Sequence, residues 1–196
     1  ENLIEVQDGQ ICKDLIETFL ADGIEVVLRP HWMTIFTKPD LIASFSDQFE
    51  SSALFSIDSE GTPLLSLSRF DTLVSDLSGV ALEFTFGLSK PVLYIDLPTR
   101  ARNSDYGDLG IEPAELQLRE KTGVVFPLDR LDQASGVVRS LVAEHPDFAE
   151  NCRATREQWV FNLGSSAKVG AAYLARHAKP EIVVPMPEAE ETPAVT

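Results

Sequence analysis

The chain has 196 residues, of which 44% are hydrophobic and 24% are charged, so it is long enough to bury a substantial core. Its formal net charge of −15 argues against general binding to nucleic acid, because such a surface repels phosphate backbones at long range. No apolar run approaches the roughly twenty residues that a membrane span needs, and no signal-peptide pattern is present. We therefore expect a cytoplasmic protein without a membrane span.

Segments with helical spacing and apolar runs of strand length are predicted to alternate through the first two thirds of the chain. Residues 97–122, which include Arg100, Arg102 and Arg119, are predicted to form a long polar connection between two strands. In chain order, the predicted elements are a helix at 11–23, a strand at 24–31, a helix at 38–49, a strand at 53–57, a short helix at 63–70, a strand at 71–75, a helix at 79–88, a strand at 91–95 and a short strand at 123–128.

From Leu131 onward the sequence predicts helices, with breaks near His145-Pro146 and at 162–164. The segment 180–196 is rich in proline and glutamate and has no aromatic residue, which is typical of a disordered tail. We therefore expect one folded domain over residues 1–179, followed by an acidic tail over 180–196. Because the chain begins at Glu1 without a methionine, we expect an excised domain or a processed product.

The alternation of strands and helices predicts an α/β fold, with a Rossmann-like, mostly parallel sheet flanked by helices and a helical C-terminal region. In such sheets, ligands bind beyond the carboxyl ends of the strands. This rule selects three places in the sequence: 29–31, 58–59 and 76–79. The two cysteines, Cys12 and Cys152, fit no metal or redox spacing, and we expect neither a metal nor a cofactor.

The junction Asp76-Leu77-Ser78-Gly79 joins a predicted strand to a predicted helix. Ser78 occupies the expected N-cap position, and Gly79 allows a backbone or a ligand to approach closely. The first amides of the helix have no internal partners and lie at the positive end of its dipole, which suits a phosphate. Glu83 lies one helical turn later on the same face, about 6 Å along the axis, where it could accept hydrogen bonds from a ribose. The alternative is that Ser78 only caps the helix and Glu83 is a solvated charge.

Two motifs resemble the C-terminal half of the CDP-glycerol glycerophosphotransferase family, which makes teichoic-acid-type and capsular polymers. They are "LRPH" at the end of a predicted strand and "SDLSGVALEFTFGLSKPVLYID" some forty-five residues later. In this resemblance, His31 matches the motif histidine, Asp76 the aspartate and Ser78 the first serine. Gly79 stands in place of the family's second serine, and Leu77 in place of a tyrosine or valine.

The resemblance implies the C-terminal, donor-nucleotide-binding domain of a GT-B fold. It also implies a CDP-activated alcohol as donor, a polymer or lipid-linked acceptor, and an N-terminal domain of the same protein that supplies the general base. The isolated domain is then expected to bind its donor better than it catalyses, and the whole protein could act at the inner face of the membrane. The final helices, including 165–178, are expected to pack toward that partner domain.

As an imidazolium, His31 could neutralise charge on the donor diphosphate when cytidine monophosphate leaves. Arg29, Asp58, Arg100 and Arg102 are secondary candidates, for which an ordinary surface role is the alternative. Two other functions remain open. One is a UDP-sugar enzyme of the GT-B class, such as an epimerase, and the other is a nucleotide-binding module that has lost its chemistry.

Overall fold

The computed structural model describes residues 2–58, 67–98 and 104–178. The chain divides into two compact units, Glu1–Glu157 and Gln158–Thr196. The first unit holds every strand of the described residues, together with the candidate site residues that the structure describes. In the second unit the described helix is α8 (Ser166–His177), and none of its residues is buried.

The first unit alternates strands and helices, as the sequence predicts. Its strands are β1 (Val26–Leu28), β2 (Phe55–Ile57), β3 (Leu73–Ser75), β4 (Val92–Ile95) and β5 (Gly123–Phe126). Its helices are α1 (Gln10–Ala21), α2 (Trp32–Thr37), α3 (Pro39–Phe49), α4 (Gly79–Leu88), α5 (Ala114–Thr122), α6 (Ala134–Ala143) and α7 (His145–Trp159), the last of which ends just past the first unit. Short 3-10 segments are η1 (Val6–Gly9), η2 (Leu67–Arg69), η3 (Ser104–Leu109) and η4 (Leu128–Gln133).

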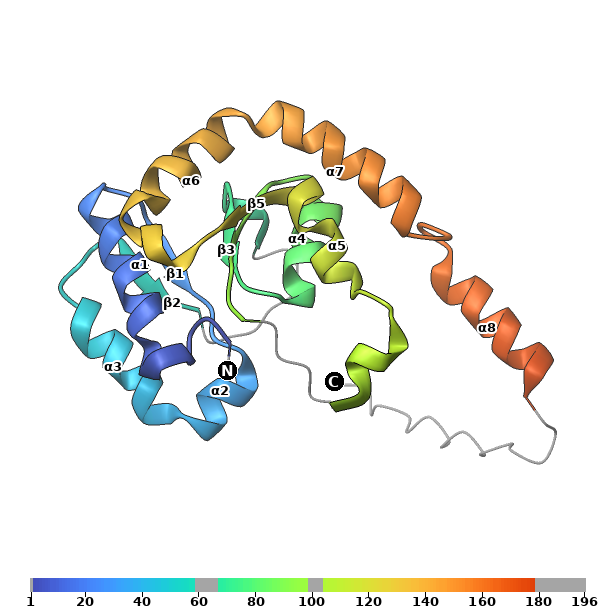
Figure 1. Cartoon of the computed structure of the whole chain (residues 1–196), viewed down its shortest axis with the longest axis horizontal. Helices are drawn as coiled ribbons and strands as arrows, with labels where there is room; N and C mark the ends of the chain where they lie inside the picture. Colours follow the sequence, from blue (N-terminus) through green and yellow to red (C-terminus); the bar gives the residue numbers. More distant parts are fainter. Residues whose placement is uncertain (1, 59–66, 99–103, 179–196) are drawn as a thin grey trace, which may run out of the picture. The chain divides into compact units, whose positions relative to one another are not determined.

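The strands form two small parallel sheets rather than one continuous sheet. In the first, β1 pairs with β2, and Leu28 lies opposite Ile57. In the second, β4 lies between β3 and β5, with Ser75 opposite Tyr94 and Ile95 opposite Phe126. All described pairings are parallel, so the carboxyl ends of paired strands meet at the same edge. The predicted α/β class, with parallel strands flanked by helices, is confirmed (Figure 1).

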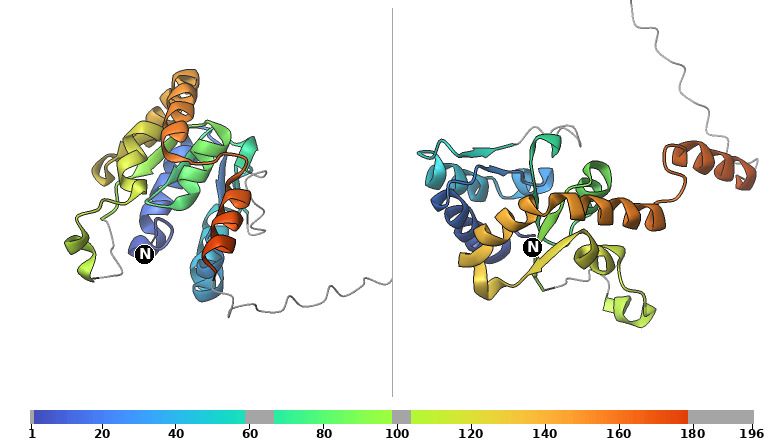
Figure 2. Two further views of the ribbon diagram at one scale, coloured as in Figure 1. Left: turned by 90° about the vertical axis from the view of Figure 1, so that its right-hand side faces the viewer. Right: turned by 90° about the horizontal axis from the view of Figure 1, so that it is seen from above.

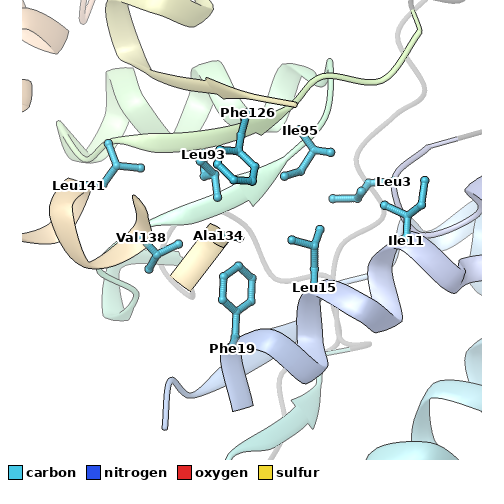
Figure 3. Packing of buried hydrophobic residues seen from close by; sticks show 10 residues of the cluster. All are labelled: Leu3, Ile11, Leu15, Phe19, Leu93, Ile95, Phe126, Ala134, Val138 and Leu141. Atoms are coloured by element: carbon cyan, nitrogen blue, oxygen red, sulfur yellow. The ribbon is translucent and has the colours of Figure 1, made fainter. Parts of the chain in front are cut away.

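Strand β4 is buried on both faces, and its alternating side chains divide the core of the three-stranded sheet. Leu93 and Ile95 face α1 and α6, in the cluster drawn in Figure 3. Val92 and Tyr94 face the other way, onto Phe84 of α4. This explains why the sequence of β4 is apolar throughout, since a strand covered by helices on both faces has no solvent side. Each such fully buried large side chain stabilises the fold by roughly 1.5–3 kcal/mol.

Helix α1 packs against both sheets. Leu15 and Phe19 enter the cluster of the three-stranded sheet, while Cys12 and Ile16 enter a second cluster with β1 and α3. Because these two sets lie on different faces of one helix, α1 joins the sheets through side-chain packing without a shared hydrogen-bond ladder. Figure 2 shows the first unit from two further directions, with α6 leading into α7.

Three sequence expectations are corrected by the structure. The predicted strand at 24–31 is shorter, because Pro30 has no N–H to continue the ladder and the chain turns into α2. Helix α2 itself was not predicted. The predicted connection 97–122 contains η3 and ends in helix α5, which buries only Leu118 and Thr122 and therefore gives a weak apolar signal. The predicted tail, 180–196, lies outside the described residues.

Candidate functional site

The carboxyl edges of the strands carry most of the candidate residues. Arg29 and His31 follow β1, Asp58 follows β2, and the junction Asp76–Gly79 follows β3. Ligands bind beyond the carboxyl ends of parallel strands, so the candidate site lies at these strand ends, those of β1 and β2 in one sheet and that of β3 in the other. Arg100 and Arg102 lie outside the described residues.

Arg29 and Asp58 face each other across the ends of β1 and β2. Arg29 Nε lies 3.8 Å from Asp58 Oδ2, and their side chains are 23% and 13% exposed. Parallel pairing explains the meeting, because Leu28 lies opposite Ile57 and each charged residue follows its strand directly. The carboxylate therefore neutralises part of the arginine's charge at this edge, a pairing that the sequence analysis did not predict.

His31 is the N-cap of α2. Its backbone is extended, and its Nδ1 accepts a hydrogen bond from the backbone N–H of Met33 at 3.2 Å. An accepting Nδ1 carries no proton, so the imidazolium form requires the ring to leave this cap. The residue is exposed, and Trp32, whose ring centroid lies 5.7 Å from that of His31, is 65% exposed. The phosphate-neutralising role of His31 stays a prediction.

The N-terminal segment ties α2 to this edge. Thr34 Oγ1 donates to Glu5 Oε1 at 2.7 Å, and Asn2 Nδ2 donates to Thr34 Oγ1 at 3.3 Å. Lys38 Nζ lies 3.4 Å from Glu5 Oε2. Burial acts to raise the pKa of Glu5, but the hydrogen bond from Thr34 and the charge of Lys38 outweigh it, and the net shift is downward. Glu5 is thus held as a carboxylate that fixes α2 in place.

Asp76 is engaged by the same N-terminal segment. The backbone N–H of Leu3 donates to Asp76 Oδ2 at 2.9 Å, and the Leu3 side chain is buried in the core. Burial raises the pKa of Asp76, and the hydrogen bond from Leu3 offsets part of that rise. Asp76 therefore has a structural partner that joins the start of the chain to the end of β3.

The N-terminus of α4 is open. Ser78 occupies the predicted N-cap with an extended backbone, but its hydroxyl makes no capping hydrogen bond. Apart from the neighbouring residues and the helix's own backbone, a Cβ atom built on Gly79 would meet no described atom within 4 Å, so the side of the first turn at Gly79 is uncovered. Glu83 is exposed one turn later. Ser78 is thus the N-cap, as predicted, while the binding of a phosphate here and of a ribose at Glu83 stays a prediction.

Lys90, which lies in the second of the two quoted motifs, points away from the carboxyl end of β3. Its Nζ donates to the backbone oxygens of Ser68 and Phe70, which precede β3. The side chain therefore fastens the loop that enters β3 at the opposite end of the sheet.

Sequence reasoning missed one further pair at the carboxyl edge. Asp96 follows β4, and its Oδ1 accepts a hydrogen bond from Arg119 Nη1 of α5 at 2.9 Å. The sequence analysis placed Arg119 in a polar connection, because the charged segment that forms α5 has only a weak helical pattern. The sequence did contain one sign of a polar contact here, because Asp96 lies at the end of a predicted strand.

Within the described ranges, no group of three or more histidine, cysteine or carboxylate side chains could hold a metal ion. In the same ranges, no helix has both the length and the apolar character needed to cross a membrane.

The thiols of Cys12 and Cys152 are buried, and burial raises their pKa values to about 12 and about 11. Both cysteines therefore stay protonated at neutral pH and are poor nucleophiles.

Comparison of the chain with models of known protein families, with curated proteins and with solved structures found no significant match. The functional assignment therefore depends on the geometry of the carboxyl edge and on the sequence motifs that lie there.

Proposed function

We propose that the first unit binds a nucleoside diphosphate and acts as the donor-binding part of a transferase that uses a CDP-activated alcohol. The observation that carries this proposal is the open N-terminus of α4 at the carboxyl end of β3. There, the Ser78 hydroxyl makes no capping bond, and a Cβ built on Gly79 would meet no described atom within 4 Å beyond the adjoining residues and its own helix backbone.

The chemistry of that position favours a phosphate group. The first N–H groups of a helix have no partner in the preceding turn, and the helix dipole adds positive potential. An anion placed there accepts hydrogen bonds from the backbone without needing a lysine or arginine, which suits a chain of net charge −15. The Ser78 hydroxyl is available as a further donor.

Glu83 supports a nucleotide rather than a free phosphate. It is exposed on α4, one turn beyond Gly79, which is about the distance from a bound phosphate to the ribose of the same nucleotide. An ionised carboxylate is an acceptor only and can receive hydrogen bonds from both ribose hydroxyls. At the end of β1, in the other sheet, His31 presents its Nε2 edge, because Nδ1 is engaged with Met33.

The choice of a CDP-activated alcohol rests on the resemblance of "LRPH" and "SDLSGVALEFTFGLSKPVLYID" to the CDP-glycerol glycerophosphotransferase family. In this proposal, an N-terminal domain supplies the base that activates the acceptor hydroxyl. The acceptor is a polymer or lipid-linked alcohol of the cell envelope, and the reaction takes place on the cytoplasmic side of the membrane.

Calorimetric titration with CDP, UDP and GDP tests the proposal. We expect CDP to bind most tightly and cytidine, which lacks phosphate, to bind at least about tenfold more weakly, because the phosphate contacts are charge-assisted. A preference for UDP would instead favour the UDP-sugar class of enzymes. Absence of binding by all three diphosphates would refute the proposal.

A further inference from the structure

An open hollow lies at the carboxyl ends of β4 and β5, and none of the residues that line it belongs to the β3–α4 junction. Its volume is about 420 Å³, within the size range of small-ligand sites. Among the described residues, one charged and four apolar residues line it: Asp96, Leu97, Pro98, Pro127 and Leu128. Sites for small organic molecules combine apolar side chains with a few polar groups in this way.

Asp96 is held rigidly at this hollow. Its backbone N–H donates to Phe126 O at 2.9 Å, which continues the β4–β5 ladder by one residue. The N–H of Leu97 then donates to Ile95 O at 2.9 Å, a three-residue turn that ends the strand at Asp96. The Asp96 side chain is 51% exposed and lines the hollow, so it is accessible to a ligand there.

Arg119 binds one side of that carboxylate from α5. Its Nη1 donates to Asp96 Oδ1, while its side chain is only 16% exposed. Its Nε is buried without a hydrogen-bond partner in the described part of the chain. A buried donor left unpaired is costly, and groups kept under such a cost need an explanation. We explain this cost by the contact that the same guanidinium makes: it keeps the Asp96 carboxylate oriented. Oδ2 of that carboxylate has no hydrogen bond within the described residues.

We propose that this hollow binds a sugar or polyol through two adjacent hydroxyl groups, with Asp96 as the acceptor and Arg119 as a positioning residue. An ionised carboxylate accepts hydrogen bonds and donates none, so it recognises hydroxyl protons. The apolar face of a sugar ring or carbon chain packs against Leu97, Leu128 and the two prolines. Because Arg119 neutralises the Asp96 charge, neither a free anion nor a free cation gains much electrostatic attraction at this pair, which leaves hydrogen bonding to a neutral ligand.

The test uses the full 15N-labelled chain and two probes that differ by one hydroxyl, methyl β-D-ribofuranoside and its 2-deoxy counterpart. We expect saturable shifts of the amide signals of Asp96, Leu97 and Leu128 with the first probe. The deoxy probe should bind at least about tenfold more weakly, because it leaves the carboxylate with one hydroxyl fewer. The absence of saturable shifts at these amides, or equal binding of both probes by the wild-type chain, overturns the proposal.

Single substitutions test whether Asp96 and Arg119 are responsible for binding of the ribofuranoside. Asp96→Asn should weaken the first probe at least about tenfold, whereas Asp71→Asn, a matched change of an exposed aspartate beside the entry to β3, should leave it unchanged. Arg119→Gln should weaken binding, and Arg119→Lys should restore part of it. If Asp96→Asn binds like the wild type, Asp96 is not the acceptor and the inference fails.

One variant separates this site from the nucleotide site. Glu83→Ala removes the proposed ribose acceptor on α4 and should leave the ribofuranoside shifts at Asp96 unchanged. If Glu83→Ala abolishes those shifts, the diol is bound at α4 and the hollow is not a site. Failure of CDP to bind, together with retained ribofuranoside shifts, would refute the proposed function alone.

Discussion

The backbone N–H of Leu3 donates to Asp76 Oδ2 at 2.9 Å, a contact between residues 73 positions apart. It brings the start of the chain to the carboxyl end of β3, where the candidate phosphate site begins. Asn2, the preceding residue, donates to Thr34 of α2. The N-terminal segment therefore fixes α2, with His31 at its start, relative to the β3–α4 junction.

Removing the acceptor from this contact should destabilise the fold. Asp76→Ala leaves the Leu3 N–H without a partner and should lower the free energy of unfolding by about 1–3 kcal/mol. Asp76→Asn keeps an oxygen acceptor and removes a buried charge, so it should be at least as stable as the wild type at pH 7. Urea denaturation measures the free energy of unfolding of both variants. An equal loss of stability in the two would contradict the role of the hydrogen bond.

The same residue predicts a pH dependence. Burial raises the pKa of Asp76 in the folded state above its unfolded value, so the folded state binds more protons between the two values. Its contribution to stability is therefore full below the unfolded pKa and is lost as pH rises through the folded pKa. The stability of Asp76→Asn relative to wild type should increase from about pH 3 to pH 7. A constant difference across this range would contradict the raised pKa.

A hydroxyl at position 79 should strengthen phosphate binding. Gly79 has open space around a built Cβ, so both serine and alanine fit there without a clash. Gly79→Ser should bind CDP more tightly than Gly79→Ala by about 0.5–1.5 kcal/mol, the net value of one hydrogen bond. Gly79→Ala is the matched control, since it adds the same Cβ without the donor. Identical affinities by calorimetry would argue against a phosphate at this position.

Glu83 should matter for binding and not for folding. Because its side chain is exposed, Glu83→Ala should change the free energy of unfolding by no more than about 0.5 kcal/mol. CDP affinity should fall by about 1.5–3 kcal/mol, the range for hydrogen bonds to a charged group. Glu120→Ala, an exposed glutamate of α5, is the control and should bind CDP like the wild type. Loss of stability with unchanged affinity would make Glu83 structural.

His31 can be tested without destroying the cap of α2. Asparagine is a favoured N-cap residue, so His31→Asn should keep the free energy of unfolding within about 0.5 kcal/mol of the wild type. If the imidazole contacts the diphosphate, CDP affinity should fall by about 1.5–3 kcal/mol. Cytidine affinity should not change, because the nucleoside has no phosphate. An unaltered CDP affinity would leave His31 with the capping role alone.

Gly123 tests the packing of the three-stranded sheet. A Cβ atom built on it would lie 1.8 Å from the backbone oxygen of Val92, which cannot move without breaking the β4–β5 ladder. Gly123→Ala should therefore cost about 3 kcal/mol or more, at or beyond the usual range for overpacking. Gly136→Ala in α6, where no atom lies within 4 Å of a built Cβ, should instead stabilise by about 0.5–1 kcal/mol. In thermal unfolding, Gly123→Ala should have a lower melting temperature than the wild type and Gly136→Ala a higher one.

Local patterns predicted the strands and most of the helices, but not α2 or α5, and not which elements contact one another. The helix over 79–88 was predicted with the observed bounds, because its apolar spacing, Ser78 and the following Lys90-Pro91 all act within one segment. Helix α2 was missed because its cap is a histidine and most of its large apolar side chains are exposed. The contacts of Asp76 with Leu3 and of Asp96 with Arg119 were not predictable, since each joins segments that only the folded chain brings together.

The order of pairing in the two sheets constrains how the chain reaches its folded state. Leu73 pairs with Val92, and Val92 in turn pairs with Gly123, so a complete helix separates the partners in each case. No described ladder is a hairpin, and none can therefore form by closing a short turn. Backbone entropy must be lost over a whole crossover before the first hydrogen bond between strands compensates for it. Folding should thus begin in the helices and their apolar contacts, with the strands aligning late and slowly for a chain of this length.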